Sequence, residues 1–386
     1  MPVLTRCSLY NHRNKIAQDV APRTLAETAR RHWAIVDALA GGSLAEAERV
    51  LRQHIESVID GDQPAPRQAL RMLPALEALW QRVRAEDAHL PDVMTLAASV
   101  GRRQYEQTNT RWNAALPRGA RARCETFDIP APTGGTIEAL RVAPPGGLRA
   151  AKANIVYLHG GGWVVGNNRT HLGAMARLAE RTACAVVGID YALAPEAPFP
   201  QGLNDCSWAW RWLRAQPGAM RRPWFVAGDS AGANLALAMM LDLRHAGEAL
   251  PDAALLFYGV YDADHDTASH RCCGDGSFGL SSAKMAWYRA HYLAGGEGAD
   301  DPRVSPLRAA SLRGLPPLFV SAAELDPLHD DSARLAARLA ESGVAHQFKP
   351  YAGLHHGFMQ MAGLLPEADR AFDDAAAFVQ AHFSKT

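Results

Sequence analysis

Short apolar runs alternate with helical stretches through the second two-thirds of the chain, and this alternation predicts an α/β fold. The runs are residues 153–158, 185–189, 224–227, 253–258, 317–321 and 347–351. Because most of them are apolar throughout, we expect strands buried on both faces, as in a mostly parallel, twisted sheet flanked by helices. Ahead of them, residues 127–130 and 136–142 are separated by Thr133-Gly134-Gly135, which predicts a β-hairpin.

The first part of the chain has a helical pattern instead. Thr24 and Ser43 are each followed three residues later by a glutamate, the spacing of a capping box at a helix start. Apolar residues recur at helical spacing after each start, so residues 1–62 are predicted to form a helical hairpin. The polar, proline-containing stretch 60–66 is the candidate linker. Residues 67–112 are again predicted to be helical, with a break at Leu90-Pro91.

Composition excludes several classes of protein. With 48% hydrophobic and 21% charged residues, the 386-residue chain can bury a sizeable core. Forty basic side chains balance forty acidic ones, which argues against a general polyanion-binding protein. No segment approaches the roughly 20 apolar residues of a membrane span, and residues 1–14 lack a signal-peptide core. The six cysteines have no CxxC spacing, so we expect reduced thiols and a cytoplasmic protein.

The strongest chemical motif is the sequence Gly-Asp-Ser-Ala-Gly at residues 228–232. It follows an apolar run and precedes a helical stretch, the context in which G-x-S-x-G forms a nucleophile elbow. Small residues allow the tight turn that exposes the serine Oγ, and the following helix N-terminus favours negative charge beside it. Ser230 is therefore the candidate nucleophile; for the motif alone, a structural glycine turn is the alternative interpretation.

A second motif, His-Gly-Gly-Gly-Trp at residues 159–163, follows the apolar run 153–158. Acyl transfer passes through a tetrahedral oxyanion, which needs backbone N–H donors about 3 Å away. A run of glycines allows the backbone to approach that closely, although a flexible turn would use glycine too. Two such motifs at the ends of predicted strands favour a site for acyl transfer.

A serine nucleophile needs a base, and the base needs an orienting carboxylate. In this architecture the acid and then the histidine follow the serine along the chain. Residues of both kinds follow the last two apolar runs, at the end of the sheet where such folds build their sites. Spacing leaves the acid open among Glu324, Asp326, Asp330 and Asp331, and the base open between His355 and His356.

Taken together, these segments resemble the hormone-sensitive-lipase-like branch of the α/β-hydrolases, especially its bacterial acetyl esterases and carboxylesterases. The resemblance covers roughly residues 70–385. The matching segments are HGGGW (159–163), DYALAPE (190–196), FPQ (199–201), GDSAGAN (228–234), DPRVSP (301–306), DPL (326–328) and HGF (356–358).

The resemblance implies an α/β-hydrolase fold in which residues 67–115 are cap helices and residues 116–386 the catalytic domain. It also implies that the stretch 279–293 is a second piece of the cap. His159 would shape the glycine loop. The implied catalytic residues are Ser230 as nucleophile, Asp326 as acid and His356 as base, with the backbone N–H groups of Gly161, Gly162 and Ala231 as oxyanion donors.

On this resemblance we expect a serine carboxylesterase that hydrolyses short-chain, acetyl-type esters and needs no metal or organic cofactor. Its partner would be a small-molecule ester, with no nucleic acid and no membrane. Two alternatives stay open. One is an amidase or deacetylase with the same triad, and the other is a non-catalytic small-molecule receptor on the same fold.

Residues 1–62 lie outside that resemblance and are similar instead to the C-terminal helices of the FCD-type ligand-sensing domain of GntR-like regulators. The similar segments are 31–39, 45–47 and 51–55. In such domains histidines at the positions of His32 and His54 help hold a metal, but the other ligands are missing here, so we expect none. Eight basic and eight acidic side chains leave no basic footprint for DNA. A fusion remnant or a dimer contact is the plainer interpretation, which leaves a homodimer open.

Overall fold

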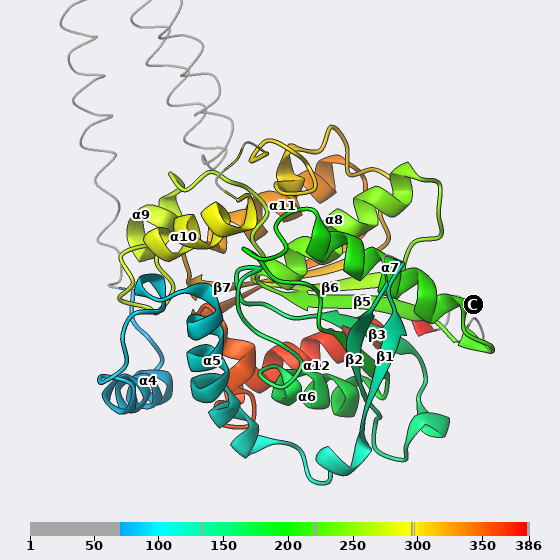
Figure 1. Cartoon of the computed structure of the whole chain (residues 1–386), viewed down its shortest axis with the longest axis horizontal. Helices are drawn as coiled ribbons and strands as arrows, with labels where there is room; N and C mark the ends of the chain where they lie inside the picture. Colours follow the sequence, from blue (N-terminus) through cyan, green and yellow to red (C-terminus); the bar gives the residue numbers. More distant parts are fainter. Residues whose placement is uncertain (1–69, 133, 220–221, 295, 297, 384–386) are drawn as a thin grey trace, which may run out of the picture. The chain divides into compact units, whose positions relative to one another are not determined.

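The computed structural model describes residues 70–383 apart from 133, 220–221, 295 and 297 (Figure 1). The chain divides into two units, Met1–Leu70 and Arg71–Thr386, and the description concerns the second. The predicted N-terminal hairpin, with His32 and His54, lies outside the described residues. No helix in the described part of the chain is both long and apolar enough to cross a membrane.

Eight strands form one sheet in the order β1-β2-β4-β3-β5-β6-β7-β8. The β1–β2 and β2–β4 pairs are antiparallel, and the remaining pairs are parallel. The strands are β1 (Cys124–Pro130), β2 (Thr136–Val142), β3 (Asn154–Leu158), β4 (Ala185–Ile189), β5 (Trp224–Asp229), β6 (Ala253–Phe257), β7 (Leu318–Leu325) and β8 (His346–His355). The predicted α/β-hydrolase sheet with its N-terminal hairpin of strands is therefore confirmed.

Helices cover both faces of the sheet. Figure 1 shows α6 and α12 on one side and α7, α8 and α11 on the other. The α-helices are α4 (Pro74–Glu86), α5 (Ala98–Asn109), α6 (Leu172–Thr182), α7 (Gln201–Ala215), α8 (Ala231–His245), α9 (Ala268–Cys273), α10 (Ser282–Tyr292), α11 (His329–Glu341) and α12 (Pro366–Gln380). Short 3₁₀ turns are η1 (Val93–Thr95), η2 (Thr110–Ala115), η3 (Arg121–Arg123), η4 (Leu148–Ala150), η6 (Pro306–Arg308) and η7 (Phe358–Met361).

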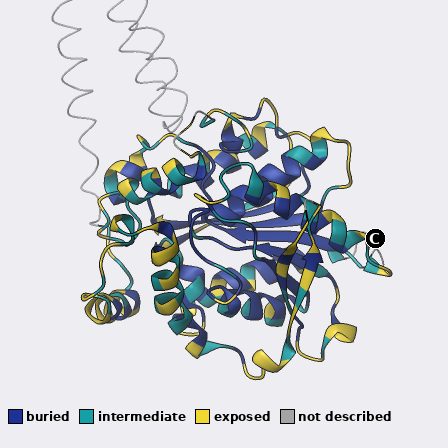
Figure 2. Ribbon diagram, viewed as in Figure 1, coloured by how far each residue is buried: buried dark blue, intermediate teal, exposed yellow. Residues whose placement is uncertain are grey.

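The core consists of two apolar layers separated by the sheet, and Figure 2 shows the central strands buried throughout. In β3, Val156 and Leu158 belong to the layer under α7, α8 and α11. Ile155 and Tyr157 belong to the layer under α6 and α12. Both sets are buried because successive side chains of a strand point to opposite faces. The unbroken apolar runs in the sequence reflect this burial on two sides.

Two strands extend beyond the apolar runs that predicted them. The β7 strand continues through Glu324 to Leu325, and β8 continues to His355. These strands pair with each other, with a register shift between Ala323 and Leu325. Backbone pairing continues past the apolar residues because ladder hydrogen bonds do not depend on side-chain polarity. Glu324 and His355 therefore lie within strands, while Asp326 and His356 follow the strand ends.

The two glycine motifs meet because their strands are neighbours. β3 and β5 pair in parallel, with Leu158 opposite Gly228. The carboxyl ends of both strands therefore lie at the same edge of the sheet, and each is followed at once by its motif. In an open parallel sheet this edge is where ligand sites form.

Candidate active site

Ser230 occupies a sharp turn between β5 and α8. Its φ of +53° lies in the left-handed region, and its backbone N–H donates a hydrogen bond to Phe257 O (2.9 Å). A Cβ at Gly228 would lie 2.4 Å from Gly232 O, and one at Gly232 would lie 1.9 Å from Leu158 O. Both glycines are therefore required by backbone contact, as the elbow motif predicts.

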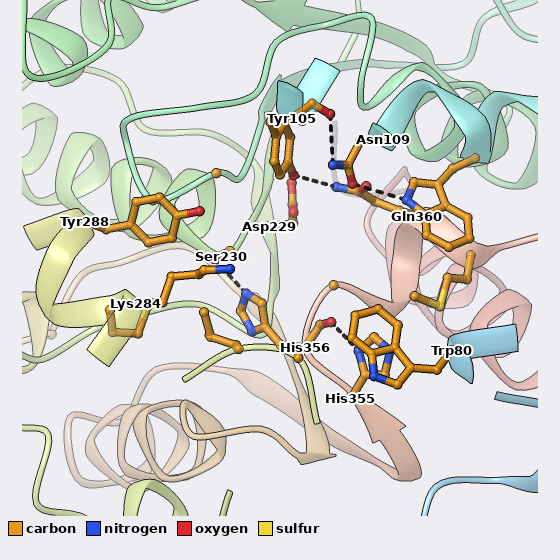
Figure 3. Close-up of a pocket in the computed structure, with 18 residues that line it drawn as sticks. Trp80, Tyr105, Asn109, Asp229, Ser230, Lys284, Tyr288, His355, His356 and Gln360 are labelled. Carbon is orange, nitrogen blue, oxygen red and sulfur yellow. Dashed lines mark hydrogen bonds between the residues drawn. The ribbon is translucent and has the colours of Figure 1, made fainter. Parts of the chain in front are cut away.

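Ser230, His356 and Asp326 form a chain of hydrogen bonds. His356 Nε2 lies 2.9 Å from Ser230 Oγ, and His356 Nδ1 lies 2.7 Å from Asp326 Oδ2 (Figure 3). The Asp326 carboxylate is fully buried, and its other oxygen accepts a hydrogen bond from Leu328 N (2.8 Å). Because an ionised carboxylate only accepts, Nδ1 carries the proton and Nε2 is free to accept from the serine hydroxyl.

The other carboxylates that spacing allowed have different contacts. Glu324 accepts a hydrogen bond from Gly353 N (2.7 Å), and Asp330 accepts one from Ser269 N (2.9 Å). Asp331 is buried and accepts hydrogen bonds from two backbone amides that follow β6. The structure thus brings only Asp326, of the four candidate acids, within hydrogen-bond distance of His356.

His355 also lies at the cavity but does not contact Ser230. Its Nδ1 donates to the backbone oxygen of His356 (2.6 Å), and its ring lies 4.8 Å from the Trp80 ring. Figure 3 shows it beside Trp80, away from the Ser230–His356 pair. Burial lowers the pKa of His355 to about 4, so its imidazole is neutral at pH 7.

The glycine loop after β3 presents free backbone N–H groups near the serine. Gly161 and Gly162 have φ values of +124° and +60°. A Cβ at Gly161 would lie 2.0 Å from Val165 O, and one at Gly162 would lie 2.2 Å from the Tyr288 ring. The N–H groups of Gly161, Gly162 and Ala231 donate to no acceptor in the part of the chain that the structure describes. Free donors of this kind suit an oxyanion.

A buried carboxylate holds this loop against the elbow. Asp229 Oδ1 accepts hydrogen bonds from Gly160 N (2.9 Å) and from the Tyr157 hydroxyl (2.7 Å). His171 Nε2 lies 3.6 Å from the other oxygen. Burial opposes ionisation of Asp229, but the His171 charge and these hydrogen bonds outweigh it and hold the pKa below its ordinary value. Asp229 therefore stays ionised and fixes the glycine loop to the end of β5.

His159 has a structural position, as the resemblance implied. Its Nδ1 donates to Gly160 O (2.8 Å), and its ring stacks on Tyr191 at 4.3 Å. The Tyr191 hydroxyl donates in turn to the backbone oxygen of His159 (2.7 Å). Burial lowers the pKa of His159 to about 3, so the ring is neutral and stays out of proton exchange at pH 7.

A cavity of about 190 Å³ opens above Ser230. Its walls come from the elbow, the glycine loop, the turn after β8 and residues of α4, α5 and α10. The lining residues are Trp80, Tyr105, Asn109, Trp112, Gly161, Gly162, Asp229, Ser230, Gly279, Leu280, Lys284, Met285, Tyr288, His355, His356, Gly357, Gln360 and Met361. Arg102 ties α5 to the glycine loop because its Nε donates to Val164 O (2.6 Å).

The apolar and aromatic side chains of α10, which lies in the stretch that the resemblance implied to be a second piece of the cap, divide between the cavity and the core. Met285 and Tyr288 line the cavity. Tyr292 instead stacks on Trp163 at 4.4 Å, with the ring planes 7° apart. The helix therefore contacts the glycine loop through Tyr292 and supplies part of the cavity wall through Met285 and Tyr288.

Several polar lining residues carry no motif and were missed by sequence reasoning. Tyr105 and Asn109 are four residues apart on α5, and Gln360 Nε2 lies 3.4 Å from the Tyr105 hydroxyl. Lys284 and Tyr288 are four residues apart on α10. The i, i+4 spacing within amphipathic helices was the available signal, but it does not tell a cavity wall from an ordinary helix face.

Across the described residues, no group of three or more His, Cys, Asp or Glu side chains has an arrangement that could hold a metal ion. Within the acidic, histidine-rich stretch 262–273, Asp262 accepts hydrogen bonds from Arg308 (2.9 Å) and Arg334 (2.8 Å). These pairs give that carboxylate a structural role.

The serine lies on a strand-to-helix elbow, a histidine is hydrogen-bonded to it, and a loop with free backbone N–H groups lies nearby. This arrangement on an α/β sheet is typical of serine hydrolases. A sequence profile described as the α/β hydrolase fold matches residues 155–360. The chain belongs to this α/β-hydrolase family, which confirms the resemblance drawn from the motifs.

The relatives are esterases. The chain is 35% identical over 288 residues to the acetyl esterases of Salmonella paratyphi A and Salmonella enteritidis PT4, covering 72% of this chain and 86% of theirs. An ester hydrolase from the metagenome of Lake Arreo superposes with a TM-score of 0.74 at 34% identity, covering 81% of this chain and all of that one. A thermostable esterase from Pseudomonas putida gives a TM-score of 0.73 at 26% identity, over 84% of this chain and all of its own. The protein is a carboxylic ester hydrolase.

Proposed function

We propose that this enzyme hydrolyses short-chain acyl esters, acetyl esters above all, through an acyl-enzyme intermediate. Ser230 is the nucleophile, His356 the general base and Asp326 the orienting acid. The observation that carries the proposal is the continuous contact from Ser230 Oγ to His356 (2.9 Å) and from His356 to the buried Asp326 (2.7 Å).

In the first half-reaction His356 Nε2 takes the Ser230 proton as Oγ attacks the ester carbonyl carbon. Asp326 keeps the imidazole oriented and stabilises its charged form. The carbonyl oxygen becomes an oxyanion, and we assign its stabilisation to the N–H groups of Gly161, Gly162 and Ala231. His356 then protonates the departing alkoxide, which leaves as the alcohol and forms the acyl-Ser230 ester.

In the second half-reaction water replaces the alcohol. His356 removes a proton from the water as its oxygen attacks the acyl carbonyl, and the same N–H groups stabilise the second oxyanion. The imidazolium returns the proton to Ser230 Oγ, and the carboxylic acid leaves. Every proton in this cycle moves through His356, so no further cofactor is required.

The small cavity supports a short acyl group. Its volume of about 190 Å³ is below the range of roughly 300–1,000 Å³ that is typical of ligand pockets. We propose that the segment 67–115, with α4 and α5, acts as the cap over this cavity and limits the substrate. The acetyl esterase activity of the Salmonella relatives points in the same direction.

The test is a series of p-nitrophenyl esters from acetate to laurate, measured with the parent protein and with Ser230→Ala. We expect kcat/KM to peak at the shortest acyl chains and to vanish in the variant. Equal activity in both proteins would show that Ser230 is not the nucleophile. The matched anilide, p-nitroacetanilide, separates an esterase from an amidase: we expect hydrolysis of the ester and little of the amide.

A further inference from the structure

Two side chains of α10 present hydrogen-bond donors to the cavity. Lys284 and Tyr288 are separated by one helical turn and both line the cavity. Figure 3 shows both extending from α10 toward the space above Ser230. Residues at i and i+4 lie on the same helix face, so the two side chains border the same part of the cavity.

Neither donor has a protein acceptor in the part of the chain that the structure describes. Lys284 forms no ion pair there, and its ammonium makes no hydrogen bond with a described residue, while its backbone N–H donates to Ser281 Oγ (3.0 Å). The Tyr288 side chain is more than nine-tenths buried, and its hydroxyl makes no hydrogen bond within the same residues. Burial raises the pKa of Tyr288 well above 10, so the hydroxyl keeps its proton. The hydroxyl oxygen is not among the buried side-chain atoms without a partner, so it is accessible from the cavity, where a ligand can accept its hydrogen bond.

The position of Lys284 is unfavourable for the helix. It is the third residue of α10, in a first turn that contains no acidic residue. Backbone N–H groups make this end of a helix positive, so a cation there is repelled and an anion is attracted. A residue that breaks a local rule without structural compensation is expected at a functional site.

The cavity contains no uncommitted anion for Lys284 to neutralise. Among the described lining residues, Lys284 is the only lysine or arginine and Asp229 the only carboxylate. Asp229 is buried and already accepts hydrogen bonds from Tyr157 and Gly160. A positive charge therefore remains at the cavity, facing whatever is bound there.

We propose that Lys284 and Tyr288 bind a carboxylate carried by the ester substrate, so that the enzyme prefers anionic esters to neutral ones. The inference rests on the proposed function because it names the substrate class of the same site. The carboxylate has two sources: the acyl part, as in the monoester of a dicarboxylic acid, or the alcohol part, as in an O-acetylated hydroxy acid.

The experiment compares anionic esters with neutral partners of the same shape. For the acyl side, the substrates are the monoethyl esters of succinate, glutarate and adipate. Each is compared with the ethyl ester in which the free carboxylate is replaced by a carboxamide. For the alcohol side, they are 4-acetoxybenzoate and 4-acetoxybenzamide. The rate of each hydrolysis is measured from the acid released at constant pH. The readout is the ratio of kcat/KM for the anionic ester to kcat/KM for its neutral partner.

A charge-assisted hydrogen bond contributes more than a neutral one, so we expect a ratio of about ten or more in one of the two arms. Lys284→Met should bring that ratio close to one, and Lys284→Arg should keep most of it. Tyr288→Phe should lower it by about threefold. Lys349→Met, which removes the same charge from a lysine that lies 3.6 Å from Asp374, should leave it unchanged.

Failure of the inference and failure of the proposed function give different results. Ratios near one in both arms, with neutral esters hydrolysed through Ser230, would overturn the carboxylate site alone. Binding to the Ser230→Ala protein adds a readout that needs no turnover: calorimetry should show 4-acetoxybenzoate or monoethyl glutarate binding about tenfold more tightly than its amide. Equal affinities of acid and amide in both pairs would reject the inference even if no ester is hydrolysed.

Discussion

Asp326 and Asp330 are carboxylates four residues apart in the same segment, yet their surroundings differ. Asp326 is fully buried and is held by His356 and by the backbone of Leu328. Asp330 accepts from Ser269 N instead. The difference arises because Asp326 directly follows β7, whereas Asp330 lies in the first turn of α11. Asp326 therefore contacts His356, whereas Asp330, four residues later, does not.

Substitution of each of these aspartates by asparagine gives a matched pair of variants. Asp326→Asn should lower kcat by about 10⁴-fold, because the amide no longer selects the Nδ1–H tautomer of His356. Asp330→Asn should keep kcat within a few-fold of the parent. Steady-state kinetics on p-nitrophenyl acetate measures both. Similar losses in the two variants would mean that Asp326 is not the orienting acid.

Two helical glycines make a second matched pair at this scale. Gly232 and Gly173 are each the second residue of a helix, α8 and α6. A Cβ at Gly232 would lie 1.9 Å from Leu158 O, whereas one at Gly173 would meet nothing closer than 3.6 Å. Gly232→Ala should therefore lower the free energy of unfolding by about 1–3 kcal/mol. Gly173→Ala should leave it unchanged or raise it by up to about 1 kcal/mol, because alanine favours a helix.

Chemical denaturation measures this pair. Equal effects of the two substitutions would contradict the backbone contact at Gly232. A gain of stability in Gly232→Ala would contradict it too.

At the scale of elements, the start of α11 is joined to the loop after β6. Asp331 Oδ2 accepts hydrogen bonds from Tyr261 N (2.6 Å) and Asp262 N (3.0 Å). Asp262 pairs in turn with Arg308 and Arg334. The loop after β6 is thereby attached to the helix that follows the candidate acid, which fixes the strand end from which Asp326 projects.

This junction predicts a pH dependence of stability. Burial raises the pKa of Asp331 to about 7, against the two amide hydrogen bonds that lower it. Its unfolded pKa is about 3.9, so the folded protein binds more protons between about pH 4 and pH 7. Stability contributed by this group is therefore present below pH 4 and is lost as pH rises to 7. Asp331→Asn should flatten that part of the stability curve.

Urea denaturation at half-unit steps from pH 4 to pH 8 measures the slope. Burial also raises the pKa of Asp190 to about 7, so part of the slope should remain in the variant. Asp330→Asn is the control and should keep the parent slope. An unaltered slope in Asp331→Asn would contradict the assignment.

At the scale of the whole molecule, residues 71–386 contain the complete sheet, both core layers and the candidate site. The described helix α4 packs Leu76 into the core, and Leu73 N donates to Gly353 O (3.1 Å). These contacts attach the chain from about residue 73 onward to the second unit, Arg71–Thr386. The boundary at 62–67 proposed from the linker remains a prediction.

A chain shortened to residues 67–386 should fold and hydrolyse p-nitrophenyl acetate with a kcat/KM within about threefold of the full chain. The reason is that every group assigned to the site lies after residue 70. Thermal unfolding and kinetics of both proteins provide the comparison. Loss of activity or a large fall in melting temperature would show that residues 1–66 support the catalytic unit.

The local sequence was sufficient for the fold and for two parts of the site. Largely apolar runs predicted β3 to β7 because buried parallel strands need apolar side chains on both faces, whereas the run that predicted β8 includes Gln347 and Lys349 and that strand is only partly buried. The elbow and the glycine loop were recognisable because only glycine tolerates their backbone contacts. Both are short-range requirements, and they leave a pattern within a few residues.

Tertiary structure decided what spacing left open. Four acids and two histidines satisfied the chain order, and only strand ends and loop contacts bring Asp326 and His356 together over Ser230. The cavity wall depended in the same way on α4, α5 and α10 meeting over the sheet. A helical pattern shows which residues share a face of the helix but not what that face contacts. Only the tertiary structure shows that the charged side chain of Lys284 lies at the cavity.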